Sequence, residues 1–259
     1  MTRSVAGSNA ANQQTTAVLD GDHWVLNGSK IFITNAGPAD VLITYAATDK
    51  SLGPKGISAF IVPADAPGVR KGKKEHKLGI HASDTREIFY ENARVPAENL
   101  LGEVNKGFAV ANDRLTRQRI PYAAGCIGVA IAAHEMAIEW AKMRTTFGEK
   151  LANRQAVQWM LVDNEIDIRT AKHFTLEAAE RARRGLPFRM EAGIAKLTAS
   201  EGGGRVVDRS MQIHGGMGMT KDLPLERWYR EMRIRRVGEG PSEVQRMVIA
   251  REILGSNLR

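Results

Sequence analysis

The fold of this chain is decided by residues 107–144, which read GFAVANDRLTRQRIPYAAGCIGVAIAAHEMAIEWAKMR. Apolar residues recur here at helical spacing and alanine is frequent, so the stretch predicts one long helix. The helical period continues in Gln155–Arg184 and Arg189–Ile213, and more briefly in Leu225–Arg236 and Ser242–Leu254. Long helices joined by short turns predict an antiparallel four-helix bundle over residues 104–259.

The chain before this stretch has the texture of β structure. Thr15–Asp20 and His23–Asn27 flank Gly-Asp, a strong hairpin signal. Turn residues at short, regular spacing separate further β-rich runs, which are Lys30–Thr34, Asp40–Ala46, Gly56–Pro63 and Glu87–Val95. This spacing predicts a compact antiparallel barrel or sandwich. We therefore expect an α+β chain with a β domain over residues 1–103 and the helical bundle after it.

Two glycine-rich stretches interrupt the helical half. Gly202-Gly203-Gly204 lies inside a helical pattern, so it predicts either close helix packing or a loop. His214-Gly215-Gly216-Met217-Gly218 follows a helix rather than a strand, so it does not fit a dinucleotide fingerprint. Its pattern favours a helix C-cap in which His214 is the last helical residue.

Composition limits the classes of function. The 259 residues are 43% hydrophobic, and no uncharged apolar run of membrane-spanning length occurs, so we expect no membrane span. The first residues have no apolar segment of the kind that a secretory signal carries. The single cysteine, Cys126, excludes an internal disulfide and a cysteine-based zinc site, and its small apolar neighbours predict a core position.

The formal charge of +8 permits an anionic partner. Most basic residues alternate with acidic ones along the predicted helices, and Glu226 and Glu231 interrupt the most basic of them. We therefore expect no nucleic-acid partner; a phosphate-bearing small ligand explains the excess charge equally well.

One carboxylate is isolated near the end of the chain, in the stretch Arg236-Val-Gly-Glu-Gly-Pro-Ser-Glu243. Glycines on both sides of Glu239 allow unusual backbone conformations and close approach of a ligand. Pro241 and Ser242 are typical of a helix start. From this segment alone Glu239 is either a base aimed into a pocket or an ordinary solvated loop residue.

Two further segments also have an ordinary and a functional interpretation. Arg144–Gly148 ends the long predicted helix. A cation is common at the C-terminus of a helix, and an arginine there can also bind a pyrophosphate group. Phe32 is by default a core aromatic, but such a residue also backs a flat cofactor ring, with Thr34 bonding its polar edge.

The order of these elements resembles the acyl-CoA dehydrogenase family of flavoproteins from about Thr2 to the C-terminus. The stretches that carry the resemblance are Ala6–Asn9, Leu26–Asn35, Lys77–Ile80 with Ser83, Arg117–Arg119, Arg144–Gly148, Gln155, Gln212–Gly216 and Glu239–Glu243. So many collinear elements make the resemblance specific, and the family's β-then-helical order matches the two textures above.

The resemblance implies an FAD enzyme that converts an acyl-CoA thioester to a trans-2-enoyl-CoA, as in fatty acid β-oxidation. Glu239 would be the base that removes the α-proton, and a hydride would pass from the β-carbon to the flavin. FAD would be held between the two domains and by a neighbouring subunit. A carboxylate moved into a dry apolar pocket is a stronger base, so this role is physically coherent.

The resemblance also assigns individual contacts. The residues implied for FAD are Thr2, Phe32, Ile33, Thr34, Arg144, Phe147, Gln155, Gln212, Gly215, Gly216, Ser242 and Glu243. Those implied on the substrate side are Ser8, Arg119 and Gly240. Arg144, Phe147 and Gln155 are expected to reach FAD across a dimer interface, and no metal is expected.

Three departures from the family pattern bear on the site. The helical domain of roughly a hundred residues with which family members begin is expected to be absent here. Gly238 replaces an aromatic that commonly precedes the base, which predicts a wider site, and Pro241 replaces a threonine. Gln118 stands where some subfamilies place an alternative catalytic glutamate, so Glu239 is the expected base.

Two functions follow from these features. The first is an acyl-CoA dehydrogenase with an electron-transfer flavoprotein as acceptor, a homo-oligomer (dimer or tetramer) in the cytoplasm or the mitochondrial matrix. The alternative is a truncated or non-catalytic half-site subunit in a hetero-oligomer with a fuller chain.

Overall fold

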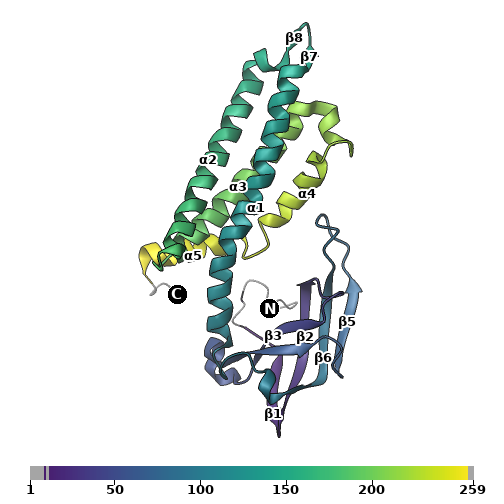
Figure 1. Cartoon of the computed structure of the whole chain (residues 1–259), viewed down its shortest axis with the longest axis vertical. Helices are drawn as coiled ribbons and strands as arrows, with labels where there is room; N and C mark the ends of the chain where they lie inside the picture. The colour runs from purple at the N-terminus through teal and green to yellow at the C-terminus, as the bar shows by residue number, and fades with distance from the viewer. Residues whose placement is uncertain (1–8, 10–11, 256–259) are drawn as a thin grey trace. The chain divides into compact units, whose positions relative to one another are not determined.

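The computed structural model describes residue 9 and residues 12–255, and the chain divides into two compact units, residues 1–114 and 115–259 (Figure 1). The first unit contains a β-sheet and the second a group of helices. Thr2 and Ser8, two of the predicted site residues, lie outside the described residues.

The described part of the first unit contains six strands that form one sheet in the order β4-β3-β1-β2-β6-β5. The strands are β1 (Thr16–Asp20), β2 (His23–Thr34), β3 (Val41–Ala47), β4 (Ile57–Pro63), β5 (Val69–Lys74) and β6 (Thr85–Pro96). The predicted succession of a β domain and a helical domain is confirmed. One pairing departs from the antiparallel prediction, because β1 and β3 meet in parallel at Thr16 and Ala47.

The predicted strands His23–Asn27 and Lys30–Thr34 are one continuous strand, β2. Two irregularities in its pairing with β6 bend the strand instead of ending it, one next to Gly28 and one between Lys30 and Ile33. Gly28 has φ +136°, and a Cβ there would lie 2.8 Å from the Thr15 Cα, so only glycine fits this bend.

Strand β5 has no counterpart in the prediction. Its sequence, Val-Arg-Lys-Gly-Lys-Lys, lacks apolar alternation because it lies at the edge of the sheet, paired only with β6. Charged residues are typical of edge strands, where they discourage pairing with other chains. The core of the sheet unit is formed instead by apolar residues of β2, β4 and β6, including Leu26, Phe60 and Ile88.

The helices agree with the predicted ranges to within one residue at each end. They are α1 (Gly107–Met143), α2 (Gln155–Arg183), α3 (Arg189–His214), α4 (Leu225–Arg235) and α5 (Ser242–Leu254). Short elements join them or the strands: η1 (Lys50–Gly56), η2 (Ala97–Asn99), β7 (Thr145–Thr146), β8 (Glu149–Lys150), η3 (Leu151–Asn153) and η4 (Gly215–Met219). The first turns of α1 belong to the sheet unit, where Ala111 is buried beside Ile57 and Ala59.

Small residues allow α1, α2, α3 and α4 to share one core. Ala123 and Cys126 of α1, Ala171 of α2, Ala199 of α3 and Met232 of α4 belong to the same buried cluster. Cys126 is fully buried, as predicted, and burial raises the pKa of its thiol to about 11.

The triple glycine lies inside helix α3, so the close-packing interpretation is confirmed and the loop is wrong. A Cβ at Gly203 would lie 2.6 Å from the Met232 Cε, and Met232 is itself buried. Gly204, one residue further along, has open space on its side. The absent side chain at Gly203 therefore leaves room for the terminal methyl group of Met232 between α3 and α4.

Among the described residues, α1 is the helix whose length and composition are sufficient to cross a membrane. The most apolar 18-residue window of α1 is 39% buried inside the structure. A core helix of a soluble protein meets the same criterion, and Ala123 and Ala133 of α1 lie in the shared core. The expectation of no membrane span remains a prediction.

Valine substitutions at Gly203 and Gly204 distinguish the effect of packing on stability from the effect of helix propensity. We expect Gly203→Val to lower the free energy of unfolding by about 1–3 kcal/mol, because the added side chain overpacks the contact with Met232. Gly204→Val is the matched control and should change it by less than about 0.5 kcal/mol. Denaturant unfolding followed by helical circular dichroism measures both, and equal effects at the two positions would contradict the packing assignment.

Candidate functional site

The segment that carries Glu239 is a tight loop between α4 and α5. Glu239 has φ +54° and Gly240 has φ +87°, so two consecutive residues adopt the left-handed region. Both the Val237 and the Gly238 N–H donate to the Ile234 carbonyl and close α4, at 2.8 and 2.9 Å. A non-glycine residue in this region is strained, which marks Glu239 as a residue held in place by its surroundings.

The Glu239 side chain is half-buried. Its Oε2 is buried and has no hydrogen-bond partner among the described residues, and the same holds for Nε and Nη1 of Arg119. Burial lowers the pKa of Arg119, Arg189 lowers it further, and the charge of Glu239 opposes this shift. Buried polar atoms are nearly always paired, so these three mark a place that a ligand or water completes.

Tyr122 of α1 fills the space beside Gly238. A Cβ at position 238 would lie 2.6 Å from the Tyr122 hydroxyl oxygen, so no side chain fits there without moving the tyrosine. Burial raises the pKa of Tyr122 to about 12, and the Arg235 guanidinium lies 4.7 Å from the centre of its ring. The widening expected from Gly238 is therefore not observed on this side, because a residue from another helix occupies the room.

A buried lysine of α3, which was not predicted from the sequence as a site residue, contacts the same loop. Lys196 is fully buried, and its Nζ donates to the Gly240 carbonyl at 2.9 Å. Desolvation lowers the pKa of its amine to about 8. The sequence contained an indication of this burial, because Lys196 falls on the buried stripe of α3 at helical spacing from Ala192 and Ala199.

A second group of predicted residues lies where α1 ends and α2 begins. Arg144 follows α1, and its carbonyl accepts the Leu151 N–H at 2.9 Å. Phe147 has φ +50° and is 96% exposed, with the Arg154 guanidinium 5.6 Å from the centre of its ring. Gln155 is the first residue of α2. An aromatic side chain this exposed is available to a ligand or to another chain.

The turn after α3 has the C-cap geometry that the sequence predicts. His214 is the last residue of α3, and the Gly215 N–H bonds back to the helix with φ +62° at Gly215. The His214 ring stacks on Trp140 of α1 at 5.1 Å, and its Nδ1 donates to the Ser210 carbonyl at 2.7 Å. Gln212 and Gly216 flank this turn, which thereby lies beside the C-terminal part of α1.

The predicted residues of the helical unit thus form two groups. Glu239, Gly240 and Ser242 lie in the loop before or at the start of α5, with the Glu239 charge acting on Arg119. Arg144 and Phe147 follow the opposite end of α1 (Figure 1). At a helical rise of about 1.5 Å per residue, Arg119 and Arg144 are roughly 37 Å apart along the axis. Within one chain, the residues around Glu239 and those around Arg144 therefore do not form one site.

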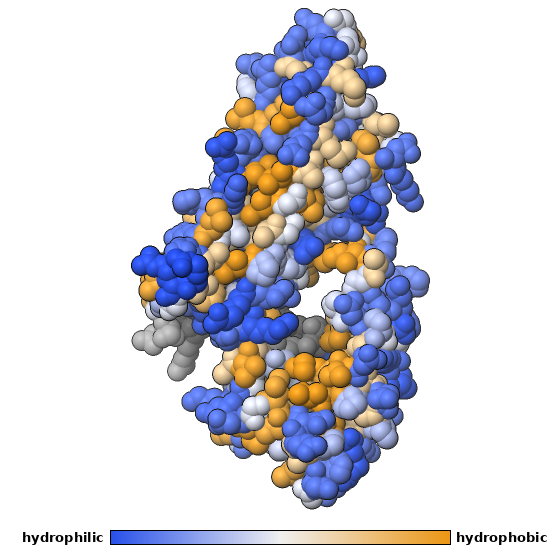
Figure 2. All heavy atoms as spheres, in the orientation of Figure 1, coloured by the Kyte–Doolittle hydropathy of each residue, from blue (hydrophilic) through white to orange (hydrophobic). Residues whose placement is uncertain are grey.

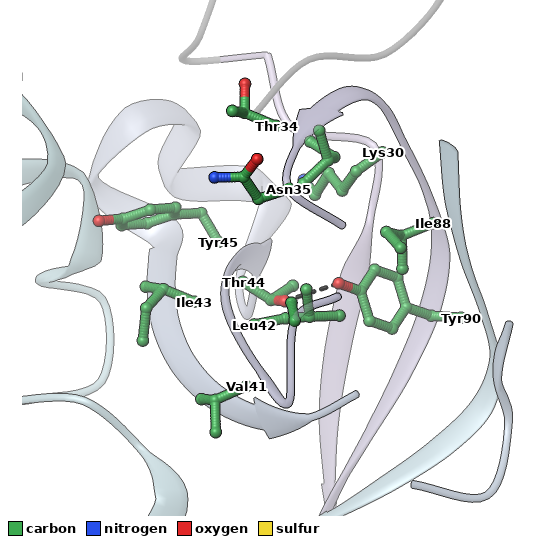
Figure 3. Close-up of a pocket in the computed structure, with 12 residues that line it drawn as sticks. Lys30, Thr34, Asn35, Val41, Leu42, Ile43, Thr44, Tyr45, Ile88 and Tyr90 are labelled. Atoms are coloured by element: carbon green, nitrogen blue, oxygen red, sulfur yellow. Dashed lines mark hydrogen bonds between the residues drawn. The ribbon is translucent and has the colours of Figure 1, made fainter. Parts of the chain in front are cut away.

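The remaining predicted residues lie on β2 of the sheet unit. Phe32 sits at the irregularity in β2, with φ +57° and 58% of its surface exposed. Ile33 and Thr34 line a cavity of about 270 Å³ together with residues of β3 and β6 (Figure 3). In its wall the hydroxyls of Thr44 and Tyr90 are hydrogen bonded at 2.7 Å. Phe32 is therefore a surface aromatic, not the core residue of the ordinary interpretation.

Candidate metal ligands are not clustered within the described ranges. No group of three or more histidine, cysteine, aspartate or glutamate side chains there is placed to hold a metal ion. The acid–base groups of the Glu239 loop are instead one carboxylate and nearby cations, a set suited to moving a proton and binding an anionic or polar ligand.

Two family models match the chain. Residues 1–93 match the middle domain of acyl-CoA dehydrogenases, and residues 105–254 match their C-terminal domain. The short-chain specific acyl-CoA dehydrogenase of Bos taurus mitochondria is 45% identical over 250 residues, which cover 96% of this chain and 61% of that protein. The chain therefore spans about three-fifths of the length of this relative.

Solved structures agree in fold. Butyryl-CoA dehydrogenase from Megasphaera elsdenii superposes with a TM-score of 0.94 at 43% identity, covering 98% of this chain and 66% of that one. A chain from the structure of the electron transferring flavoprotein of Acidaminococcus fermentans gives a TM-score of 0.95, also at 43% identity, over 98% of this chain and 67% of that one.

Substitution at Gly238 tests the contact with Tyr122. We expect Gly238→Ala to lower the free energy of unfolding by about 1–3 kcal/mol, because the new methyl group meets the Tyr122 hydroxyl. Tyr122→Phe removes that hydroxyl, so the loss should shrink markedly when the two substitutions are combined. Thermal or denaturant unfolding of the parent, the two single variants and the double variant gives the free energies for a double-mutant cycle. If the two changes in the free energy of unfolding are purely additive, Gly238 and Tyr122 are not in contact.

Proposed function

Since the chain belongs to the acyl-CoA dehydrogenase family, we propose that it oxidises an acyl-CoA thioester to the trans-2-enoyl-CoA with Glu239 as the base. The observation that carries the proposal is the Glu239 carboxylate, which is buried on one oxygen, unpaired among the described residues and held in a strained loop. A structural loop has no need of an unpaired buried carboxylate, whereas a base must keep its lone pairs free for the substrate.

Members of this family are FAD flavoproteins, and the residues present here fit that cofactor. The exposed Phe32 ring, with Ile33 and Thr34 beside it, offers a flat apolar surface next to a hydroxyl and backbone groups. The Gly215 and Gly216 turn has no side chain to obstruct a phosphate, and Arg144 supplies a cation. When bound, FAD supplies the acceptor for the hydride that leaves the β-carbon.

The residues proposed to hold FAD come from both units of the chain. They are Phe32, Ile33, Thr34, Arg144, Phe147, Gln155, Gln212, Gly215, Gly216, Ser242 and Glu243, with Thr2 outside the described part. The two groups in the helical unit are too far apart to serve the same end of one cofactor. This separation supports the proposal that Arg144, Phe147 and Gln155 serve the site of a neighbouring subunit.

In the proposed reaction the chain binds, orients and deprotonates the substrate. Glu239 takes the α-proton, and its own backbone N–H donates to the thioester oxygen, where charge develops. Gly240 lets the acyl chain approach the loop without a side chain in the way. Arg119, buried and incompletely paired, keeps the surroundings of the carboxylate positive, which favours an anionic thioester enolate nearby.

The half-site alternative is not favoured. A subunit that only supports another chain's site need not retain a base, and here the base is present with its loop fully formed. Two relatives that match over nearly the whole of this chain, from Bos taurus and Megasphaera elsdenii, are themselves named as dehydrogenases. We propose an electron-transfer flavoprotein as the acceptor, and the cytoplasm or the mitochondrial matrix as the compartment.

The proposal includes an oligomer. Orange patches lie between blue ones on the surface of the helical unit in the space-filling view (Figure 2). On α2, Trp159, Val162 and Ile166 are more than half exposed, at 62, 56 and 57%, and recur at helical spacing. A stripe of large apolar side chains on one helix is typical of a surface that another chain covers.

The Glu239→Gln variant tests the base. We expect reduction of bound FAD by an acyl-CoA to slow by about 10²–10⁴-fold, because an amide cannot accept the α-proton. The purified chain is loaded with FAD, and the decay of the visible flavin absorbance is recorded after acyl-CoA is added. Glu177→Gln, an exposed carboxylate of α2, is the control and should react like the parent.

Two results would overturn the proposal. Bleaching of the Glu239→Gln variant at the parent's rate would remove Glu239 from the reaction. A chain that never binds FAD would exclude autonomous activity and restore the half-site alternative.

Ile166→Glu tests the oligomer. A glutamate buried at this position of the apolar stripe costs several kcal/mol of association, so we expect the variant to sediment as a smaller species than the parent. Ile166→Leu keeps the surface apolar and should leave the oligomer intact. Sedimentation equilibrium measures the mass, and identical masses for all three proteins would exclude this stripe as the interface.

A further inference from the structure

The loop that carries Glu239 needs an external support. Glu239 occupies the left-handed region at φ +54°, a conformation that is strained for a residue with a side chain. Such a conformation persists only when surrounding contacts fix it. The contacts that fix this loop come from α3 and from the first turn of α5.

Lys196 of α3 holds the middle of the loop. Its Nζ lies 2.9 Å from the Gly240 carbonyl oxygen, and the side chain is fully buried. The amine also lies 5.8 Å from the centre of the Tyr122 ring, which stabilises its charge. A charged donor forms a stronger hydrogen bond to a carbonyl than a neutral donor does, so Lys196 fixes the peptide between Gly240 and Pro241.

Glu201 of α3 ties the two ends of the loop together. Its Oε1 accepts the Ser242 hydroxyl at 2.6 Å, and its Oε2 accepts the Arg236 Nε at 2.8 Å. Arg236 precedes Glu239 by three residues and Ser242 follows it by three. One carboxylate therefore closes the loop on both sides of the base, and these bonds lower the pKa of Glu201 although burial opposes the shift.

Gln245 of α5 completes the support. Its Nε2 donates to the carbonyls of Glu239 and Gly240, at 3.1 and 3.0 Å, and its side chain is fully buried. The Gly240 carbonyl thus receives two donors, one from Lys196 and one from Gln245. Gln245 therefore holds both peptide groups after the base, and Lys196 holds the second of them from a different helix.

We propose that Lys196 and Glu201 are positioning residues, which clamp the Arg236–Ser242 loop and thereby aim the Glu239 carboxylate. The clamp itself is inferred from the contacts of these residues, and only its effect on catalysis rests on the proposed function. Neither residue needs to touch the substrate, since each acts through the backbone or the ends of the loop.

Hydrogen–deuterium exchange of the full chain tests the clamp without any assay of activity. In Lys196→Met we expect the amides of residues 237–240 and 242–244 to exchange about tenfold faster or more, because the loop opens more often. Amides in the middle of α2 serve as the internal reference and should keep their protection. Lys172→Met, which removes an exposed lysine of α2, is the matched control and should leave the loop unchanged.

Glu201→Gln provides a second variant that keeps the shape of the side chain. It retains one acceptor oxygen where the parent has two, so the loop should lose one of its two end bonds and exchange faster as well. Unchanged loop exchange in both variants overturns the clamp. A rise of equal size in the loop and in α2 also overturns it, because the two residues would then contribute only to global stability.

Kinetics of the FAD-loaded chain test the positioning of the base. We expect Lys196→Met to lower kcat by about 10²-fold while KM stays within about threefold, because a base displaced by roughly 1 Å loses alignment and not binding. A looser loop with unchanged kcat would overturn the positioning role. If the parent itself fails to reduce FAD, the proposed function is wrong, and the exchange experiment still decides the clamp.

Discussion

The close packing of α3 against its neighbours is the constraint on which the helical unit depends. Gly203 leaves room for Met232, so α4 approaches α3, and the Glu239 loop begins where α4 ends. Helix α5 also packs on α3, where the Cβ position of Gly193 lies 3.4 Å from Ile249, an ordinary van der Waals contact. Since both helices that flank the loop pack on α3, side chains of α3 reach the loop.

In this loop, features that serve the proposed function lower the stability of the folded state. Glu239 combines a strained backbone with a buried oxygen that no described residue satisfies, and Arg119 has two such nitrogens. Each feature costs free energy in the folded state, and natural proteins concentrate such costs at sites that act on ligands. The buried bonds of Lys196 and Glu201 offset part of that cost, since they fix the loop without using the Glu239 carboxylate.

Sequence reasoning succeeded where periodicity is strong and failed where a tertiary contact decides. The helices were predicted closely because their apolar period extends over many turns. Strand β5 was missed because an edge strand of mostly charged residues has no apolar alternation. Strand β2 was divided at Gly28 because a glycine there reads as a turn, although in the sheet it makes a bend. The effect of Gly238 was misjudged because Tyr122, far away in sequence, fills the space.

The sequence by itself determined the two-part fold and the order of the motifs, because hydrophobic period and turn residues are local properties that need no knowledge of the third dimension. It also singled out Glu239 between its two glycines. Only the tertiary structure decided which atoms of Glu239 and Arg119 are buried without partners, and that Lys196 supports the loop. Burial and pairing depend on residues far apart in the chain, so a buried lysine and a surface lysine look the same until the helices are packed.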